Sequence, residues 1–148
     1  MGQGWLPPTL TTTTAEASPL LSGQAVLSWP GSTTWAWRTC EGSRCLQVVY
    51  ADSLNAVAAP GVRFTGDATR PSIEATFRRS VSAVGRLPCD ILLTVHPSFA
   101  GMDDKLKRRR EQPDSEPFVD PAACRAYAAA AANRLEQRIA DEGKSALH

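Results

Sequence analysis

Hydrophobic and polar residues alternate with a period of two over residues 33–39, which is typical of a β-strand. The turn-forming residues Glu-Gly-Ser-Arg follow between Cys40 and Cys45, and an apolar run over residues 46–51 comes next. The two tryptophans of the first segment, Trp35 and Trp37, are two residues apart and therefore share one face. The pattern predicts a β-hairpin with a cysteine on each side of its tip.

Two later segments carry apolar residues three or four positions apart, which favours amphipathic helices. The first helix is expected to open at residues 69–72, with Pro71 in its first turn, and to close at Gly85. Its predicted buried stripe is Ile73, Phe77, Val81 and Val84. The second helix is expected to begin with Asp120 as N-cap and a first-turn proline, and to end before Gly143. Its predicted apolar face is Cys124, Ala128, Ala131, Leu135 and Ile139.

A further strand is predicted over residues 90–95, because their near-continuous apolar character suits burial on both faces of a sheet. His96 follows this strand directly, and residues at strand ends are well placed to enter a cleft built by loops. An isolated histidine ordinarily makes a structural hydrogen bond, and metal ligation is the alternative. A zinc site takes three or four ligands, so His96 cannot form one alone.

The chain divides near Pro30. Residues 1–29 have no sustained period and are interpreted as an irregular leader that need not be native, whereas residues 30–148 are interpreted as part of a domain. A hydrophobic content of 43% is enough for a core. The formal net charge of +1 gives no field that would favour nucleic acid, and the absence of an 18-residue apolar stretch argues against a membrane-spanning helix.

Residues 102–111 predict a short charged helix, followed by a loop over residues 112–116. The helix contains Lys105, Lys107, Arg108, Arg109 and Arg110. A basic run can mark an RNA or DNA contact, but aromatic platforms and a wider basic surface are absent from this one. A solvated helix face is the preferred interpretation, and we expect no nucleic-acid partner.

Five separated segments carry a resemblance to a known family. They are Pro30-Gly-Ser-Thr-Thr-Trp-Ala-Trp37, Cys40-Glu-Gly-Ser-Arg-Cys45, Val49-Tyr-Ala-Asp-Ser-Leu54, Leu87-Pro-Cys-Asp-Ile-Leu-Leu-Thr-Val-His-Pro97 and Phe118-Val-Asp-Pro-Ala-Ala-Cys-Arg-Ala-Tyr127. In this order they resemble the C-terminal half of a subclass-three metallo-β-lactamase. The resemblance implies an α/β fold, namely a partial metallo-β-lactamase αβ/βα sandwich in which a few strands are covered by helices.

The resemblance also implies a zinc-dependent reaction, in which two zinc ions hold a hydroxide that attacks the carbonyl of a β-lactam antibiotic. Such enzymes carry a His-x-His-x-Asp-His box, which is absent between Met1 and Pro30. They carry another zinc histidine at the position of Ser28, and a serine hydroxyl is a poor zinc ligand. Only His96 carries over as a metal ligand, so we expect the chain as given to be inactive.

The segment after the second strand resembles the active-site rim of these enzymes, where two short polar side chains hold the carboxylate of the drug. Ser53 matches the first, and Asn55 replaces the usual second. The alternative is that Asp52 and Ser53 merely bond nearby backbone, as such residues do in turns. Trp35 and Trp37 would belong to the scaffold and rim.

Four cysteines at separations of five and 35 positions suit two local bridges in an oxidising compartment. The resemblance supports a Cys40–Cys45 disulfide, and a Cys89–Cys124 bridge would tie the last helix to the strand before His96. Free thiols are the alternative for both pairs. The resemblance implies a periplasmic or secreted protein, but the start of the chain lacks a secretory signal. A truncated or misassigned N-terminus would resolve that conflict.

Two function classes stay open. The first is a segment of a zinc-dependent β-lactam hydrolase, and the second is a non-catalytic remnant or a binding module that kept the scaffold. An upstream coding sequence with the histidine box would favour the first class, and a native start at Met1 would favour the second.

Overall fold

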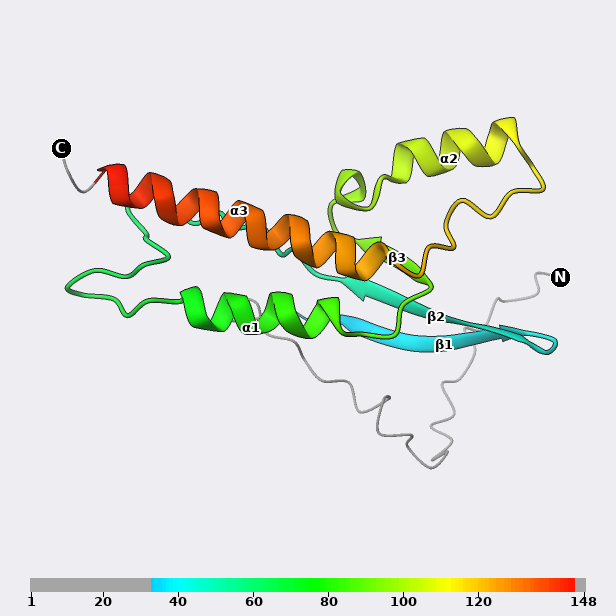
Figure 1. Ribbon diagram of the computed structural model, residues 1–148, viewed down its shortest axis with the longest axis horizontal. Coiled ribbons are helices and arrows are strands. Elements are labelled where there is room, and N and C mark those ends of the chain that lie inside the picture. Colours follow the sequence, from blue (N-terminus) through cyan, green and yellow to red (C-terminus); the bar gives the residue numbers. More distant parts are fainter. Residues whose placement is uncertain (1–32, 146–148) are drawn as a thin grey trace, which may run out of the picture.

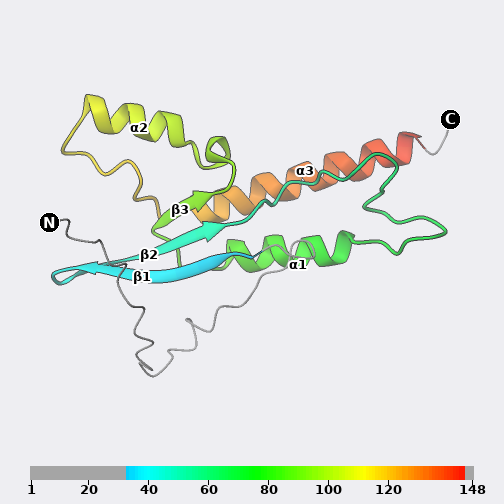
Figure 2. The same ribbon diagram turned by 180° about the vertical axis from the view of Figure 1, so that it is seen from behind.

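A computed structural model describes residues 33–145; the expected leader over residues 1–29, with Ser28, lies outside the described residues. The elements in chain order are β1 (Trp35–Glu41), β2 (Arg44–Ala51), α1 (Glu74–Gly85), β3 (Ile91–Thr94), the 3-10 helix η1 (Pro97–Ala100), α2 (Met102–Glu111) and α3 (Ala123–Ser145). Figures 1 and 2 show α1 and α3 side by side, with α2 standing apart from both. The mixed α/β architecture agrees with the predicted fold class.

The predicted hairpin is confirmed. Strands β1 and β2 pair antiparallel, with Cys40 opposite Cys45, and Gly42 in the tip has a left-handed φ of 58° that glycine adopts without strain. β2 also pairs in parallel with β3, so the strand order is β1-β2-β3.

The two faces of this sheet differ. Val49 and Leu92 point into the core, where they are buried together with residues of α1 and α3. On the opposite face Trp35 is 59% exposed, Trp37 39% and Tyr50 37%. We call these three residues the aromatic face. Burial of β3 is also one-sided, since Ile91 and Leu93 are only half-buried, and the prediction of burial on both faces was wrong for the described part of the chain.

Helix α1 buries the predicted stripe but begins later than expected. Phe77, Val81 and Val84 are buried, and Ile73 is the half-buried N-cap. The predicted start at residues 69–72 was wrong, because the carboxylate of Asp67 accepts the N–H groups of Thr69 and Arg70 at 2.8 and 3.0 Å. This closes a separate turn, so that Pro71 precedes the helix.

Helix α3 buries Cys124, Ala128, Ala131 and Leu135, as predicted, and Ile139 is partly buried against the core. Its first turn is preceded by Asp120, whose carboxylate accepts the N–H of Ala122 at 2.9 Å, as a capping residue does. The first-turn position predicted for Pro121 was wrong, because the helix begins at Ala123. The predicted end before Gly143 was also wrong, since the helix runs to Ser145.

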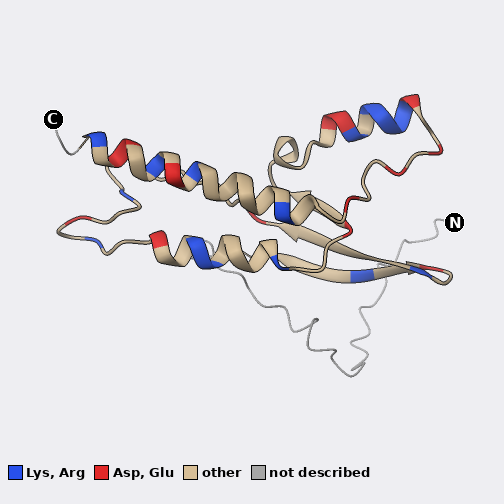
Figure 3. Cartoon of the chain, in the orientation of Figure 1, with Lys and Arg blue, Asp and Glu red and all other residues tan. Residues whose placement is uncertain are grey.

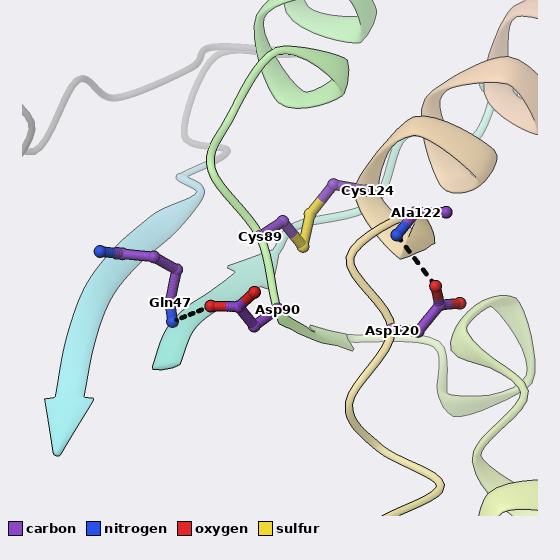
Figure 4. The surroundings of a disulfide bond; sticks show 6 residues. All are labelled: Gln47, Cys89, Asp90, Asp120, Ala122 and Cys124. Carbon is purple, nitrogen blue, oxygen red and sulfur yellow. Dashed lines mark hydrogen bonds between the residues drawn. A yellow bond between two sulfur atoms is a disulfide. The ribbon is translucent and has the colours of Figure 1, made fainter. Parts of the chain in front are cut away.

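Both expected disulfides are present, Cys40–Cys45 and Cys89–Cys124, so all four cysteines are paired. The second bridge joins Cys89, two residues before β3, to the first turn of α3 (Figure 4). Next to it the carboxylate of Asp90 accepts the N–H of Gln47 at 2.8 Å, which fixes β3 to β2. The chain that enters the strand leading to His96 is therefore held by a covalent bond at Cys89 and by a hydrogen bond at Asp90.

Helix α2 has no buried residue, which agrees with a solvated charged helix. Asp103 and Asp104 lie in its first turn and Arg108, Arg109 and Arg110 in its last, which complements the helix dipole, although the helix ends at the acidic Glu111 (Figure 3). Within residues 33–145, none of the helices combines the length and the apolar character needed to cross a membrane.

The last turns of α3 are anchored by Glu142, which is 7% exposed. Its carboxylate accepts the N–H groups of Phe64 and Thr65 at 2.9 and 3.0 Å and the Nε–H of Arg138 at 2.6 Å. Burial acts to raise the pKa of Glu142, but these donors outweigh burial and lower the pKa from 4.5 to about 2. The connection from β2 to α1 is thereby fastened to the far end of α3 (Figure 1).

We expect Glu142→Gln to lower the free energy of unfolding by about 2 kcal/mol near neutral pH, since it removes the charge that Arg138 and the buried N–H groups face. The pKa of Glu142 is lower in the folded chain, so this stabilisation is complete above the ordinary pKa of 4.5 and is lost as the pH falls toward about 2. Urea unfolding of both proteins across this range measures the difference.

The matched control for this prediction is Glu136→Gln on the same helix. Glu136 forms an exposed ion pair with Arg78, and such pairs contribute little to stability. A Glu142→Gln effect that stays constant down to about pH 2, or that is no larger than the effect of Glu136→Gln, would contradict the anchoring role.

Candidate metal and substrate site

The exposed side chain of His96 lies two residues beyond the end of β3, because the strand ends at Thr94, one residue earlier than predicted. His96 is the N-cap of η1, and its carbonyl oxygen accepts the hydroxyl of Thr94 at 2.7 Å and the N–H of Phe99 at 2.9 Å. Its imidazole ring lies against the ring of Phe99, with centroids 5.3 Å apart. Within residues 33–145 the ring nitrogens have no hydrogen-bond partner, so the ordinary structural role is not observed there.

The rim segment, residues 52–55, leaves β2 at the same end of the sheet. β2 and β3 are parallel neighbours in which Ala51 lies opposite Thr94, so the chain leaves both strands at one edge. Carboxyl ends of adjacent parallel strands are a common place for a binding site. The register thus brings His96 and the rim segment to one end of the sheet, although they are far apart in the sequence.

Ser53 and Asn55 are both half-buried. The carboxylate of the preceding Asp52 accepts the N–H groups of Ser53 and Thr33 at 2.6 and 3.1 Å. Asp52 therefore acts as a turn residue, as the alternative interpretation expected for it.

Two residues of α3 that hold this site were not singled out as site residues in the sequence. The buried Tyr127 and the half-buried Arg134 both hydrogen-bond the backbone of the rim segment. Burial raises the pKa of the Tyr127 phenol, so its hydroxyl remains a donor at neutral pH. The sequence signal that could have identified Tyr127 is its spacing, because it lies three residues after Cys124 and therefore on the buried side of the helix.

The described residues do not fit a complete zinc centre. Within residues 33–145 no three His, Cys, Asp or Glu side chains lie close enough together to hold a metal ion. The four cysteines are unavailable as thiolates, because they form the two disulfides. His96 can therefore supply at most one ligand of a site whose other ligands come from elsewhere.

No protein-family model matches the chain, but solved structures do. The chain is 42% identical to the Rm3 metallo-β-lactamase, with a TM-score of 0.72, over 77% of this chain and 42% of that one. It is 36% identical to MEM-A1, a subclass B3 metallo-β-lactamase from a soil metagenome library, with a TM-score of 0.70, over 76% and 42% of the two chains. MIM-1 from Novosphingobium pentaromativorans matches at 36% identity and a TM-score of 0.66, over 79% and 40%. The chain thus spans about two fifths of the length of these structures.

Proposed function

We propose, from the premise that this chain carries part of the fold of a subclass B3 metallo-β-lactamase, that it is a segment of a zinc-dependent β-lactam hydrolase and is inactive by itself. The observation that carries the proposal is the placement of His96, an accessible imidazole at a strand end, in a chain 42% identical to such an enzyme. In a complete enzyme His96 would supply one zinc ligand.

In this proposal the rim segment would contact the substrate. Ser53 and Asn55 lie at the sheet end that also carries His96, so they are suited to contact the carboxylate of a β-lactam held near the metal. The two disulfides support a periplasmic or secreted location, because such bonds persist in oxidising compartments.

The proposal predicts that the 148-residue chain does not turn over a chromogenic cephalosporin, even with excess zinc, because one ligand cannot hold the metal. The measurement compares the hydrolysis rate of the chain with that of its His96→Ala variant, and the two rates should be equal. Turnover by the unaltered chain above the variant would refute the proposed inactivity.

A second candidate is a non-catalytic remnant or a binding module that retains the scaffold. It is favoured by Ser28, which stands where the resembling enzymes carry a zinc histidine. The nucleotides upstream of Pro30, read in all three frames, separate the two candidates. A His-x-His-x-Asp-His box in one of these frames supports the hydrolase, whereas binding of a β-lactam without any such box supports the binding module.

A further inference from the structure

Tyr127 uses its hydroxyl twice on the backbone of the rim segment. The hydroxyl donates to the carbonyl oxygen of Asp52 and accepts the N–H of Leu54, both at 3.0 Å, so it spans the backbone on either side of Ser53. The side chain is only 3% exposed. A buried hydroxyl with both contacts made restrains the segment that it bonds, since breaking either contact leaves a buried polar group unpaired.

Arg134 links the same segment to the turn that carries His96. Its Nη2 donates to the carbonyl oxygen of Leu54 at 3.1 Å, and its guanidinium lies 4.5 Å from the centroid of the Phe99 ring. The Phe99 ring in turn contacts the His96 ring. The Nε of Arg134 is buried and has no partner within the described part of the chain, so these two contacts are what hold the guanidinium there.

Tyr127 and Arg134 are seven residues apart, which is about two helical turns and places them on one side of α3. We propose that this pair consists of positioning residues that fix the rim segment relative to His96. That the position of the rim segment relative to His96 matters for hydrolysis rests on the proposed function. The restraint of the rim segment by Tyr127 and Arg134 is a property of the chain, and it is measurable without metal or drug.

The test uses the full, oxidised, isotope-labelled chain in solution, without zinc or β-lactam. Tyr127→Phe is expected to speed hydrogen exchange of the Leu54 amide by roughly fivefold to tenfold, because it removes only the hydroxyl. Arg134→Met is expected to shift the ring resonances of His96, because Phe99 loses the guanidinium that covers its ring. The chain has only two histidines, so a His148→Ala variant assigns these resonances.

Arg138→Met is the matched control. Arg138 lies one turn further along α3 and makes the same two kinds of contact elsewhere, to the carbonyl oxygen of Val62 at 2.8 Å and to the ring of Phe64 at 5.8 Å. Because Arg138 also donates to Glu142, any faster exchange of the Leu54 amide in this variant should be matched by core amides such as that of Leu135, while the His96 resonances stay unchanged. If Arg134→Met does not fold, Arg134→Lys replaces it. The lysine keeps a cation near Phe99 but lacks the planar guanidinium that bonds Leu54. The Leu54 amide should then exchange faster, while the ring resonances of His96 shift little.

Three outcomes would overturn the inference. In the first, the His96 resonances do not respond to Arg134→Met. In the second, Arg138→Met shifts these resonances as much as Arg134→Met does. In the third, Tyr127→Phe speeds exchange of core amides such as that of Leu135 as much as that of Leu54, which would mean that the residue acts only through overall stability. A failure of hydrolysis in any other experiment leaves this result unaffected, since no catalysis is measured.

Discussion

Replacing Cys89 and Cys124 together by alanine is expected to lower the free energy of unfolding by about 3 to 4 kcal/mol. The disulfide joins positions 35 residues apart, and in the chain-entropy model its loss releases a loop of that size in the unfolded chain. Both cysteines are also buried, at 8% and 1% exposure, so alanine leaves space in the core. Urea unfolding under non-reducing conditions measures the loss.

The control is the corresponding double substitution at Cys40 and Cys45. This disulfide joins positions only five residues apart in a hairpin that the strand ladder already closes, so a smaller loss is expected. Peptide mapping without reduction checks the pairing itself. A peptide that joins Cys45 to Cys89 would contradict both the pairing and the fold.

A chimera of residues 28–148, with Ser28→His, and the remaining part of the Rm3 enzyme is expected to hydrolyse a chromogenic cephalosporin. In that chimera His96→Ala should lower the rate by about a hundredfold or more, because loss of a ligand should cost at least as much as loss of a residue that only supports one. The zinc content per protein should fall as well, since the ligands bind the metal together.

Two comparisons make the prediction specific to His96. The same substitution in the 148-residue chain should change neither zinc content nor hydrolysis, and His148→Ala in the chimera should leave the rate intact. Equal rates for the chimera and its His96→Ala variant would show that the resemblance assigns the wrong role to this residue.

The local parts of the fold were predictable because their signals are local. Alternation of β-forming residues around the turn residues of the hairpin placed β1 and β2, and spacings of three and four placed Phe77, Val81 and Val84 on one buried stripe. The ends of the helices were harder to predict from the sequence, because side-chain hydrogen bonds to the backbone accompany them. Asp67 bonded the N–H groups ahead of α1, and the contacts of Glu142 accompany the continuation of α3 past Gly143.

The candidate site likewise has a part that the sequence predicts and a part that it does not. The position of His96 after an apolar strand is visible in the sequence, and so are the short polar residues of the rim segment. The contacts of Tyr127 with Asp52 and of Arg134 with Leu54 join residues 75 and 80 positions apart. No periodicity carries information on such pairs, because they arise only when α3 packs along the connection after β2.

The aromatic face has a consequence for the handling of the chain in a cell. Within residues 33–145, helices cover one side of the sheet, and Trp35, Trp37 and Tyr50 are exposed on the other. Exposed apolar surface of this kind promotes association with other chains and with holdase chaperones. The abundance of this chain is therefore expected to depend on its capture by the quality-control machinery as well as on its free energy of unfolding.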